Sequence, residues 1–548
     1  MKRPHPRSAA ILETELKLLM AADALNRISM LPVVAAHARD VGTQETLTAR
    51  YFDTADRQLS KRGITFRVRK EGGGYVQTVK TAPPKDGAAL TRCEWSAPVD
   101  GWDPDRDLVA PAAAHESLLR KIVLGNRLEP IFETDIRRDK HLIDLPAGPL
   151  GDGAPTGERA VIEMAIDRGT VAAGGRKAPI AEIELELIEG RPDSLYRFAM
   201  AIAADLPVRP SVINKAAMGW RLAEVPADSS ELTSPTWVAA PDPKWTKRKP
   251  ISTDDALAAV VSQCLFHLVA NTEPAREGVA EGIHQMRVAT RRLRSIEALF
   301  RSVLPQEDRD RLREGARMIA AALGPARDWD VLQIETLPAG RLGAGNGTTL
   351  QEEPAWDALK VAVEQRRAAA HRSVAAMIDD GAFGRFTIWL GWWYESRGWR
   401  NGCPAPNRLD RSVTALASKR LAAQHRKVTT DAALFATLDT EARHAVRKRV
   451  KKLRYSVDFF SGLYKTKSVK GYRKALKSIQ DRLGRMNDAA VADALLTNLC
   501  RDLAAKADIE FGLVAGRTIG WIDRDAAEAL AATDKIWNRF RNAEPFWR

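Results

Sequence analysis

The sequence predicts an α+β protein of at least two domains, with an antiparallel β domain followed by an all-α domain. The chain has 548 residues, whereas a single hydrophobic core stops growing near ~250–300 residues. Short segments with alternating polar and apolar residues, separated by glycines and prolines, fill the chain up to Gly219. After Thr253 a helical periodicity rich in Ala, Leu and Arg replaces them.

The composition is that of a folded protein with an excess of positive charge. Hydrophobic residues make up 45% and charged residues 28% of the chain, which excludes collagen-like and wholly disordered classes. The formal net charge is +14, and residues 251–548 carry +12 of it. Such an excess indicates a polyanionic partner, which could be nucleic acid, an anionic membrane or a phosphate compound.

The cysteines and the hydropathy indicate a reducing compartment. Cys93, Cys264, Cys403 and Cys500 lie far apart with no CxxC pair, so neither a zinc knuckle nor a disulfide framework is predicted. No run approaches the ~20 apolar residues of a membrane span. We therefore expect a cytoplasmic protein that has no membrane partner.

The β domain is predicted from its alternating segments and ends at a proline-rich linker. Prolines recur between residues 226 and 250, which predicts a linker over residues 223–251. The all-α domain should begin at residue 252. The clearest strand segments are Thr65–Lys70, Tyr75–Thr81, Thr91–Pro98, Ala160–Arg168 and Ile180–Ile188.

One face of these strands carries charged side chains that separate by sign. Carboxylates alternate with apolar residues in the segments Glu13–Leu18 and Glu182–Leu187. A sheet with one solvated face explains any single strand. Two acidic strands beside basic ones favour a polar cavity instead, because opposed like charges destabilise a sheet unless a ligand compensates them. The cations on the other strands are Arg67, Arg69, Lys80 and Arg92.

A cavity of this kind suits the hydrolysis of a metal–polyphosphate complex. Mg²⁺ and Mn²⁺ take oxygen ligands from carboxylates and from phosphate. Lysine and arginine side chains hold phosphoryl oxygens and offset the charge that develops on the leaving phosphate. The hypothesis is therefore metal-assisted hydrolysis of a phosphoanhydride.

The order of these motifs resembles the CYTH superfamily, the triphosphate tunnel metalloenzymes. Glu13–Lys17 matches the ExExK signature of that family. The resemblance covers residues 8–222 and implies an eight-stranded antiparallel β tunnel, or barrel, that encloses a charged lumen. The motifs that follow in the family's order are Tyr51–Thr54, Phe66–Arg69, Thr78–Lys80, Arg92–Glu94, Arg137, Glu182–Glu186 and Lys215.

The resemblance also implies roles for individual residues and a cofactor, Mg²⁺ or Mn²⁺. The implied catalytic residues are Glu13, Glu15, Lys17 and Glu94. The implied metal ligands are Glu13, Glu15, Asp167, Glu184 and Glu186, with Glu163 and Glu182 in the same acidic shell. The implied substrate-binding residues are Arg67, Arg69, Lys80, Arg92, Arg137 and Lys215.

The all-α domain contains an internal repeat of basic helices. Two sets of four residues have offsets 0, 3, 7 and 10 and lie 160 residues apart, and Asp328 recurs as Asp488 at the same shift. At ~100° per residue each set occupies one helix face, so a duplicated helical unit is predicted. The first set is His284, Arg287, Arg291 and Arg294. The second set is His444, Arg447, Lys451 and Arg454.

The two basic segments resemble the signature helices of CHAD domains. They are Gly282–Arg294 and His444–Tyr455, and the resemblance spans residues 252–545. It implies a duplicated helical bundle that binds inorganic polyphosphate through these eight residues. The alternatives are a solvated helix face and, for the histidines, a metal site. The tryptophans Trp389, Trp392, Trp393 and Trp399 favour bundle packing over a base-stacking platform.

The sequence therefore predicts a metal-dependent hydrolase of inorganic triphosphate that carries a polyphosphate-binding module. Within the same fold, thiamine triphosphatase, RNA 5′-triphosphatase and class IV adenylate cyclase are alternatives. A non-catalytic polyphosphate-binding scaffold is an alternative of another class. Nucleic acid stays open as a partner, since the basic face attracts any polyanion. Polyphosphate granules are one site in the cytoplasm where such a protein could reside.

Overall fold

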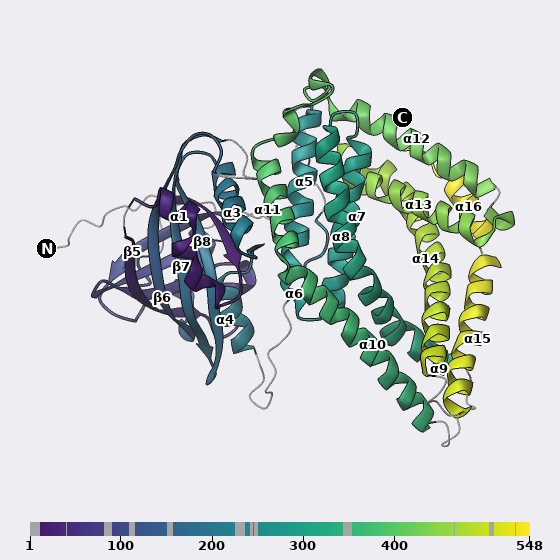
Figure 1. The fold of residues 1–548 in the computed structure, drawn as a ribbon, viewed down its shortest axis with the longest axis horizontal. Helices are drawn as coiled ribbons and strands as arrows, with labels where there is room; N and C mark the ends of the chain where they lie inside the picture. Colours follow the sequence, from purple (N-terminus) through teal and green to yellow (C-terminus); the bar gives the residue numbers. More distant parts are fainter. Residues whose placement is uncertain are drawn as a thin grey trace. The chain divides into compact units, whose positions relative to one another are not determined.

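The chain folds into two compact units, one built on a β-sheet and one built of helices (Figure 1). The first unit comprises Met1–Trp237, Leu268–Glu277 and Ile378–Gly398, and the second comprises Val238–His267, Gly278–Met377 and Trp399–Arg548. The computed structural model describes residues 11–39, 41–81, 90–108, 116–150, 157–224, 236–241, 245, 250–343, 353–433, 435–464, 466–503, 509–531 and 533–547.

The first unit contains an antiparallel sheet in the order β5-β4-β3-β2-β6-β7-β8-β1-β9. The predicted class, an antiparallel β domain with helices followed by an all-α region, is confirmed. The sheet has nine strands in the described residues rather than eight, because the three-residue β9 pairs with β1. The strands are β1 (Ile11–Leu19), β2 (Thr43–Asp53), β3 (Thr65–Glu71), β4 (Gly74–Lys80), β5 (Leu90–Val99), β6 (Glu129–Leu145), β7 (Ala160–Ala173), β8 (Arg176–Glu189) and β9 (Arg209–Ser211).

Strand β1 pairs with both β5 and β8, which are the first and last strands in the row β5-β4-β3-β2-β6-β7-β8. Its residues 11–15 pair with β5, and its residues 15–19 pair with β8. The sheet therefore curves round on itself, and alternate side chains point into its interior or toward the helices outside. Leu16 and Leu18, which alternate with Glu15 and Lys17, are fully buried on the outer face, where α3 packs against β1 and β8.

The helices of the first unit cover the sheet and fill one part of its interior. Helix α2 packs against the outer face of β3 and β4, and α4 packs against residues of β2, β6 and β7 that include Leu47 and Ile136. Two of the helices, α6 and α11, come from the second half of the chain. The helices are α1 (Pro32–His37), α2 (Glu116–Gly125), α3 (Asp193–Asp205), α4 (Lys215–Ala223), α6 (Thr272–Arg276) and α11 (Gly381–Glu395).

Helix α11 packs directly against α3 and β9. A side-chain carbon at Gly391 would lie 2.0 Å from the ring of Tyr196, and one at Gly384 would lie 1.8 Å from the carbonyl oxygen of Val208. Both glycines are therefore required by the close approach of the helix. Trp389 and Trp393 are buried, as the packing interpretation predicted.

The second unit is a bundle in which a helix pair occurs twice. The pair α7–α8 corresponds to α13–α14 at the 160-residue shift that the sequence contains. No helix of the described residues is long and apolar enough to cross a membrane. The helices are α5 (Thr253–Ala270), α7 (Ala280–Leu299), α8 (Gln306–Val331), α9 (Leu337–Gly343), α10 (Glu353–Asp379), α12 (Val413–Ala433), α13 (Thr440–Phe460), α14 (Thr466–Leu503), α15 (Ile509–Ala531) and α16 (Thr533–Arg541).

Candidate functional site

A charged cavity of about 370 Å³ lies inside the sheet of the first unit. Among the described residues, eight carboxylates and six cations line it, so the lining has a net negative charge. A polyanion and a negative lining fit together only if a cation accompanies the polyanion. The carboxylates belong to Glu13, Glu15, Glu45, Glu71, Glu94, Glu163, Glu184 and Glu186. The cations are Arg67, Arg69, Lys80, Arg138, Lys140 and Lys215.

The structure gathers most of the residues that the sequence analysis selected for this cavity. Lys17 and Asp167 lie buried at its base with exposed fractions of 1% and 0%. The side chain of Arg92 lies outside the described residues, although its backbone pairs with Glu13. The selected residues on the cavity wall are Glu13, Glu15, Arg67, Arg69, Lys80, Glu94, Glu184, Glu186 and Lys215.

Arg137 does not face the cavity, which corrects the placement implied by the motif. Its side chain is 62% exposed, and its nearest acidic group is Asp139 at 4.0 Å. The next residue of β6, Arg138, points inward instead, together with Thr134, Ile136 and Lys140 of the same strand. Strand alternation puts neighbouring residues on opposite faces, so only one of the two arginines can reach the lumen.

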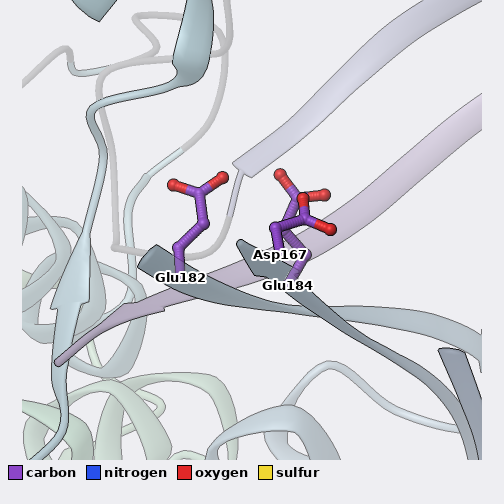
Figure 2. Close-up of side chains that lie close together, drawn as sticks. All are labelled: Asp167, Glu182 and Glu184. Atoms are coloured by element: carbon purple, nitrogen blue, oxygen red, sulfur yellow. The ribbon is translucent and has the colours of Figure 1, made fainter. Parts of the chain in front are cut away.

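At the base of the cavity three carboxylates and three cations form one buried ion cluster. Lys17 Nζ donates to Glu182 Oε1 at 2.7 Å and to Glu184 Oε1 at 2.5 Å. Lys215 Nζ lies 2.6 Å from Asp167 Oδ2 and 2.8 Å from Glu184 Oε1. Figure 2 shows the three carboxylates on neighbouring strands β7 and β8, with those of Asp167 and Glu184 close together.

Arg138 completes this cluster, which a fourth buried carboxylate, Glu15, approaches at 3.7 Å from Lys17 Nζ. Its Nε and Nη2 atoms donate to the two oxygens of Asp167 at 2.7 and 2.6 Å, and Nη2 also reaches Glu184 Oε2 at 2.5 Å. Burial alone would raise the pKa of Glu184, but Lys17, Lys215 and Arg138 hold this pKa well below its ordinary value. Burial likewise disfavours the charge on Lys215, yet the neighbouring carboxylates raise its pKa well above its ordinary value.

The carboxylates farther from this cluster carry excess negative charge. Burial and the nearby charges of Glu13 and Glu163 raise the pKa of Glu186 to about 7. Lys80 is the cation shared in this region, with its Nζ 2.9 Å from Glu13 Oε2 and also bound to Glu94. Carboxylate oxygens that repel one another in this way are the donors that a hard divalent cation requires.

One group of described carboxylates has the spacing of a metal site, whereas the region around Glu13 and Glu186 is marked by repulsion between carboxylates. The oxygens of Asp167, Glu182 and Glu184 lie within 4.8 Å of one another, the spacing of a metal site. All three already bind cationic side chains of the protein. A metal there would have to displace ammonium or guanidinium groups, whereas a metal near Glu13 and Glu186 would relieve repulsion.

Among the lining residues, a tyrosine for which no role was predicted lies beside the basic side chains. Arg67 forms a hydrogen bond with the hydroxyl of Tyr51, which lines the cavity and stacks on Phe132. Burial would raise the pKa of Tyr51, but Arg67 lowers it. Arg69 pairs with Glu71 on the same strand, so it is less available to an anion than Arg67.

The buried ion cluster leads to a stability prediction. Replacing Lys17 by Met should lower the free energy of unfolding by about 3–5 kcal/mol, because Glu182 and Glu184 would lose a buried partner. Arg137→Met, at an exposed position of the same sheet, should change it by less than about 0.5 kcal/mol. Denaturant unfolding of both variants tests this, and equal losses would contradict the role of the cluster.

In the second unit, α7 and α13 bring four of the predicted basic residues together. Arg447 and Lys451 on α13 interact electrostatically with Arg287 and Arg291 on α7. Burial, Arg291 and Arg447 lower the pKa of Lys451 to about 7. Such a concentration of like charge costs free energy unless an anion compensates it.

The two repeats support these cations in related ways. Arg287 Nη1 donates to the carbonyl oxygen of Gly324 at 2.7 Å and lies 3.3 Å from Asp328 Oδ1. In the second copy Arg447 lies 3.9 Å from Asp488, the residue equivalent to Asp328. Each copy therefore holds its arginine against an aspartate of the following helix.

The four other predicted basic residues lie less centrally. Arg454 is paired with Asp458 at 3.1 Å and with Gln480 at 3.2 Å, and Arg294 is exposed. Burial lowers the pKa of His284 and of His444, which favours their neutral forms. Arg327 on α8 also belongs to this region, since its charge acts on His284 and Arg287. It was not predicted, because it lies outside both repeated sets.

Comparisons with known proteins agree with this two-part organisation. The CYTH domain model matches residues 12–216, and the CHAD domain model matches residues 259–497. The inorganic triphosphatase of Haemophilus influenzae is 27% identical over 173 residues, which cover 31% of this chain and 44% of that protein. An uncharacterised protein of Mycobacterium tuberculosis is 25% identical over 338 residues, which cover 60% of each chain.

The chain thus spans less than two thirds of the length of these curated relatives. Among solved structures, the CHAD domain from the plant Ricinus communis is 27% identical with a TM-score of 0.46, covering 58% of this chain and 98% of that one. The two family models match in sequence order and without overlap. The chain contains a CYTH domain, matched over residues 12–216, followed by a CHAD domain, matched over residues 259–497.

Proposed function

We propose that the cavity of the CYTH domain hydrolyses inorganic triphosphate with the help of Mg²⁺ or Mn²⁺. The observation that carries the proposal is the cavity itself, in which eight carboxylates and six basic side chains line one space inside the sheet. Similarity to an inorganic triphosphatase supports the same reaction class. In such a reaction water attacks a terminal phosphorus atom and the phosphoanhydride bond breaks, so that the products are orthophosphate and the departing pyrophosphate.

In this proposal Glu13, Glu15 and Glu186 would hold the metal ion, and the ion would neutralise phosphate charge and polarise the attacked phosphorus. Their donor chemistry fits, since Glu186 lies among carboxylates that raise its pKa. Asp167 instead would orient Arg138 and Lys215, to which both of its oxygens bind. Arg67 and Lys80 would bind the phosphate oxygens and stabilise charge on the departing group.

The cavity lining favours an inorganic substrate over a nucleotide. Its apolar members are small or aliphatic, and its one aromatic ring, in Tyr51, is already stacked on Phe132. A nucleobase usually binds against an exposed aromatic or apolar surface. The described lining offers charged groups for phosphate and no such surface.

A panel of substrates with and without metal tests the proposal. Inorganic triphosphate, ATP and thiamine triphosphate should be compared at equal concentration with Mg²⁺ or Mn²⁺, with phosphate release as the readout. We expect the fastest turnover with inorganic triphosphate and none with a chelator present. Cyclic AMP as the main product from ATP would point to a cyclase, and no hydrolysis in any condition would leave a binding scaffold.

We further propose that the CHAD domain binds inorganic polyphosphate at the α7–α13 surface formed by Arg287, Arg291, Arg447 and Lys451. The concentration of like charge there supports an anion site. Because both domains belong to one chain, binding of a phosphate chain would raise its effective concentration at the CYTH cavity. Competition with duplex DNA at physiological salt separates polyphosphate recognition from general attraction of polyanions.

Polyphosphate binding should depend on pH above neutrality. Lys451 faces Arg287, Arg291, Arg447 and Asp488, and its pKa of about 7 makes it neutral at higher pH in the free protein. A bound anion raises that pKa, so binding above pH 7 takes up a proton and weakens by up to about tenfold per pH unit. Calorimetry in two buffers measures the number of protons taken up on binding. Lys451→Arg should abolish this dependence, and an unchanged dependence would contradict the assignment.

A further inference from the structure

The segment that carries Lys215 is held at both ends by acidic residues that follow residue 270 in the sequence. This β9–α4 segment runs from Arg209 to Ala223 and belongs, like its acidic partners, to the first unit. Its β9 residues pair with Leu19, Leu18 and Lys17 of β1. Lys215 is the first residue of α4, and from there its ammonium group enters the buried ion cluster.

The start of the segment is anchored by Arg209, whose exposed fraction is 9%. Its Nε donates to Glu273 Oε1 of α6 at 3.0 Å, and its Nη1 lies 3.1 Å from Asp379 at the end of α10. Arg276 of α6 also binds Asp379, at 2.8 Å. These contacts connect β9 to α6 and to Asp379, which belong to the same unit as β9.

The end of the segment is anchored by Arg221, six residues after Lys215. Its two terminal nitrogens donate to the two oxygens of Glu277 at 3.1 and 2.9 Å, which is the bidentate arrangement of a strong ion pair. Glu277 directly follows α6. The position of α4, and with it that of Lys215, is therefore held by apolar packing against β2, β6 and β7 together with the ion pairs of Arg209 and Arg221.

We propose that Glu277 and Glu273 are positioning residues for Lys215, so that residues outside the CYTH sequence region tune triphosphate binding in the cavity. The inference rests on the proposed function. Lys215 Nζ reaches Asp167 and Glu184 within 2.6–2.8 Å, and a small rotation of α4 removes it from that range. Misplacing one cation that binds phosphate weakens substrate binding.

The test is a charge-swap series in the full-length protein. Glu277→Arg and Arg221→Glu should each raise KM for triphosphate about three- to tenfold, and the double swap should return KM to within about twofold of the starting value. In a Lys215→Ala background, Glu277→Arg should change KM by less than about twofold, since the cation it positions is gone. Equal effects in the two backgrounds would overturn the proposal.

A matched control and a readout without turnover complete the experiment. Asp144→Arg disrupts another bidentate pair of the same unit, with Arg39, and should leave KM unchanged. Hydrogen exchange of peptides covering residues 209–224 should accelerate about fivefold or more in Glu277→Arg and recover in the swap. Unchanged exchange would refute the positioning role. If the unmodified protein hydrolyses no triphosphate, the proposed function fails and exchange alone decides the inference.

Discussion

Glu13→Gln should reduce triphosphate turnover about 100-fold or more while leaving polyphosphate binding intact. The substitution keeps the shape of the side chain and removes one of the charges that make the acidic end of the cavity a fit for a divalent cation. Loss of a single ligand or charge at such a site typically costs factors of this size. The half-saturating Mg²⁺ concentration should rise about tenfold as well.

The measurement is phosphate release across a series of Mg²⁺ concentrations, with thermal melting to confirm folding. Glu133→Gln is the matched control, since Glu133 is a half-exposed carboxylate of β6 that pairs with Arg50 away from the cavity. Its turnover should stay within about twofold of the unmodified protein. Normal turnover in Glu13→Gln, or an equal loss of turnover in both variants, would contradict the proposal that Glu13 binds the metal ion.

The fold could be predicted where the sequence alternates cleanly. Segments such as Thr65–Lys70 and Ile180–Ile188 fall within β3 and β8, because one face of these strands is apolar and the other is charged. Strand β9 could not be predicted in this way, since three residues are too short for a period-two pattern. The placement of α6 and α11 in the first unit depends on tertiary contacts that local sequence does not encode.

The cavity residues could be predicted by type more reliably than by position. In β6 both Arg137 and Arg138 are charged and both faces of the strand are polar, so alternation gave no indication of which arginine points inward. The ion pairs between the cavity residues could not be predicted from the sequence either. Lys17 was expected to serve in catalysis, and only the register of β1 against β8 shows its ammonium beside Glu182 and Glu184.

In the CHAD domain, reversing charge at the centre of the α7–α13 surface should have a large effect on polyphosphate affinity. Arg291→Glu should raise the Kd about tenfold or more, and adding Lys451→Glu should raise it about 100-fold or more. Each reversal removes an attractive contact and puts a carboxylate among the remaining cations. The slope of log Kd against log salt should become shallower by about one to two ions.

Arg294→Glu is the matched control for this prediction, because it makes the same charge change three residues along the same helix. Arg294 belongs to the repeated sequence set but is absent from the electrostatic contacts described for Lys451 and Arg447. If the surface around Arg291 forms the site, Arg294→Glu should weaken binding clearly less than Arg291→Glu, because the side chain of Arg294 is exposed. Equal weakening by Arg291→Glu and Arg294→Glu would mean that net charge governs affinity, and the four-residue site would have to be abandoned in favour of general attraction between a basic domain and a polyanion.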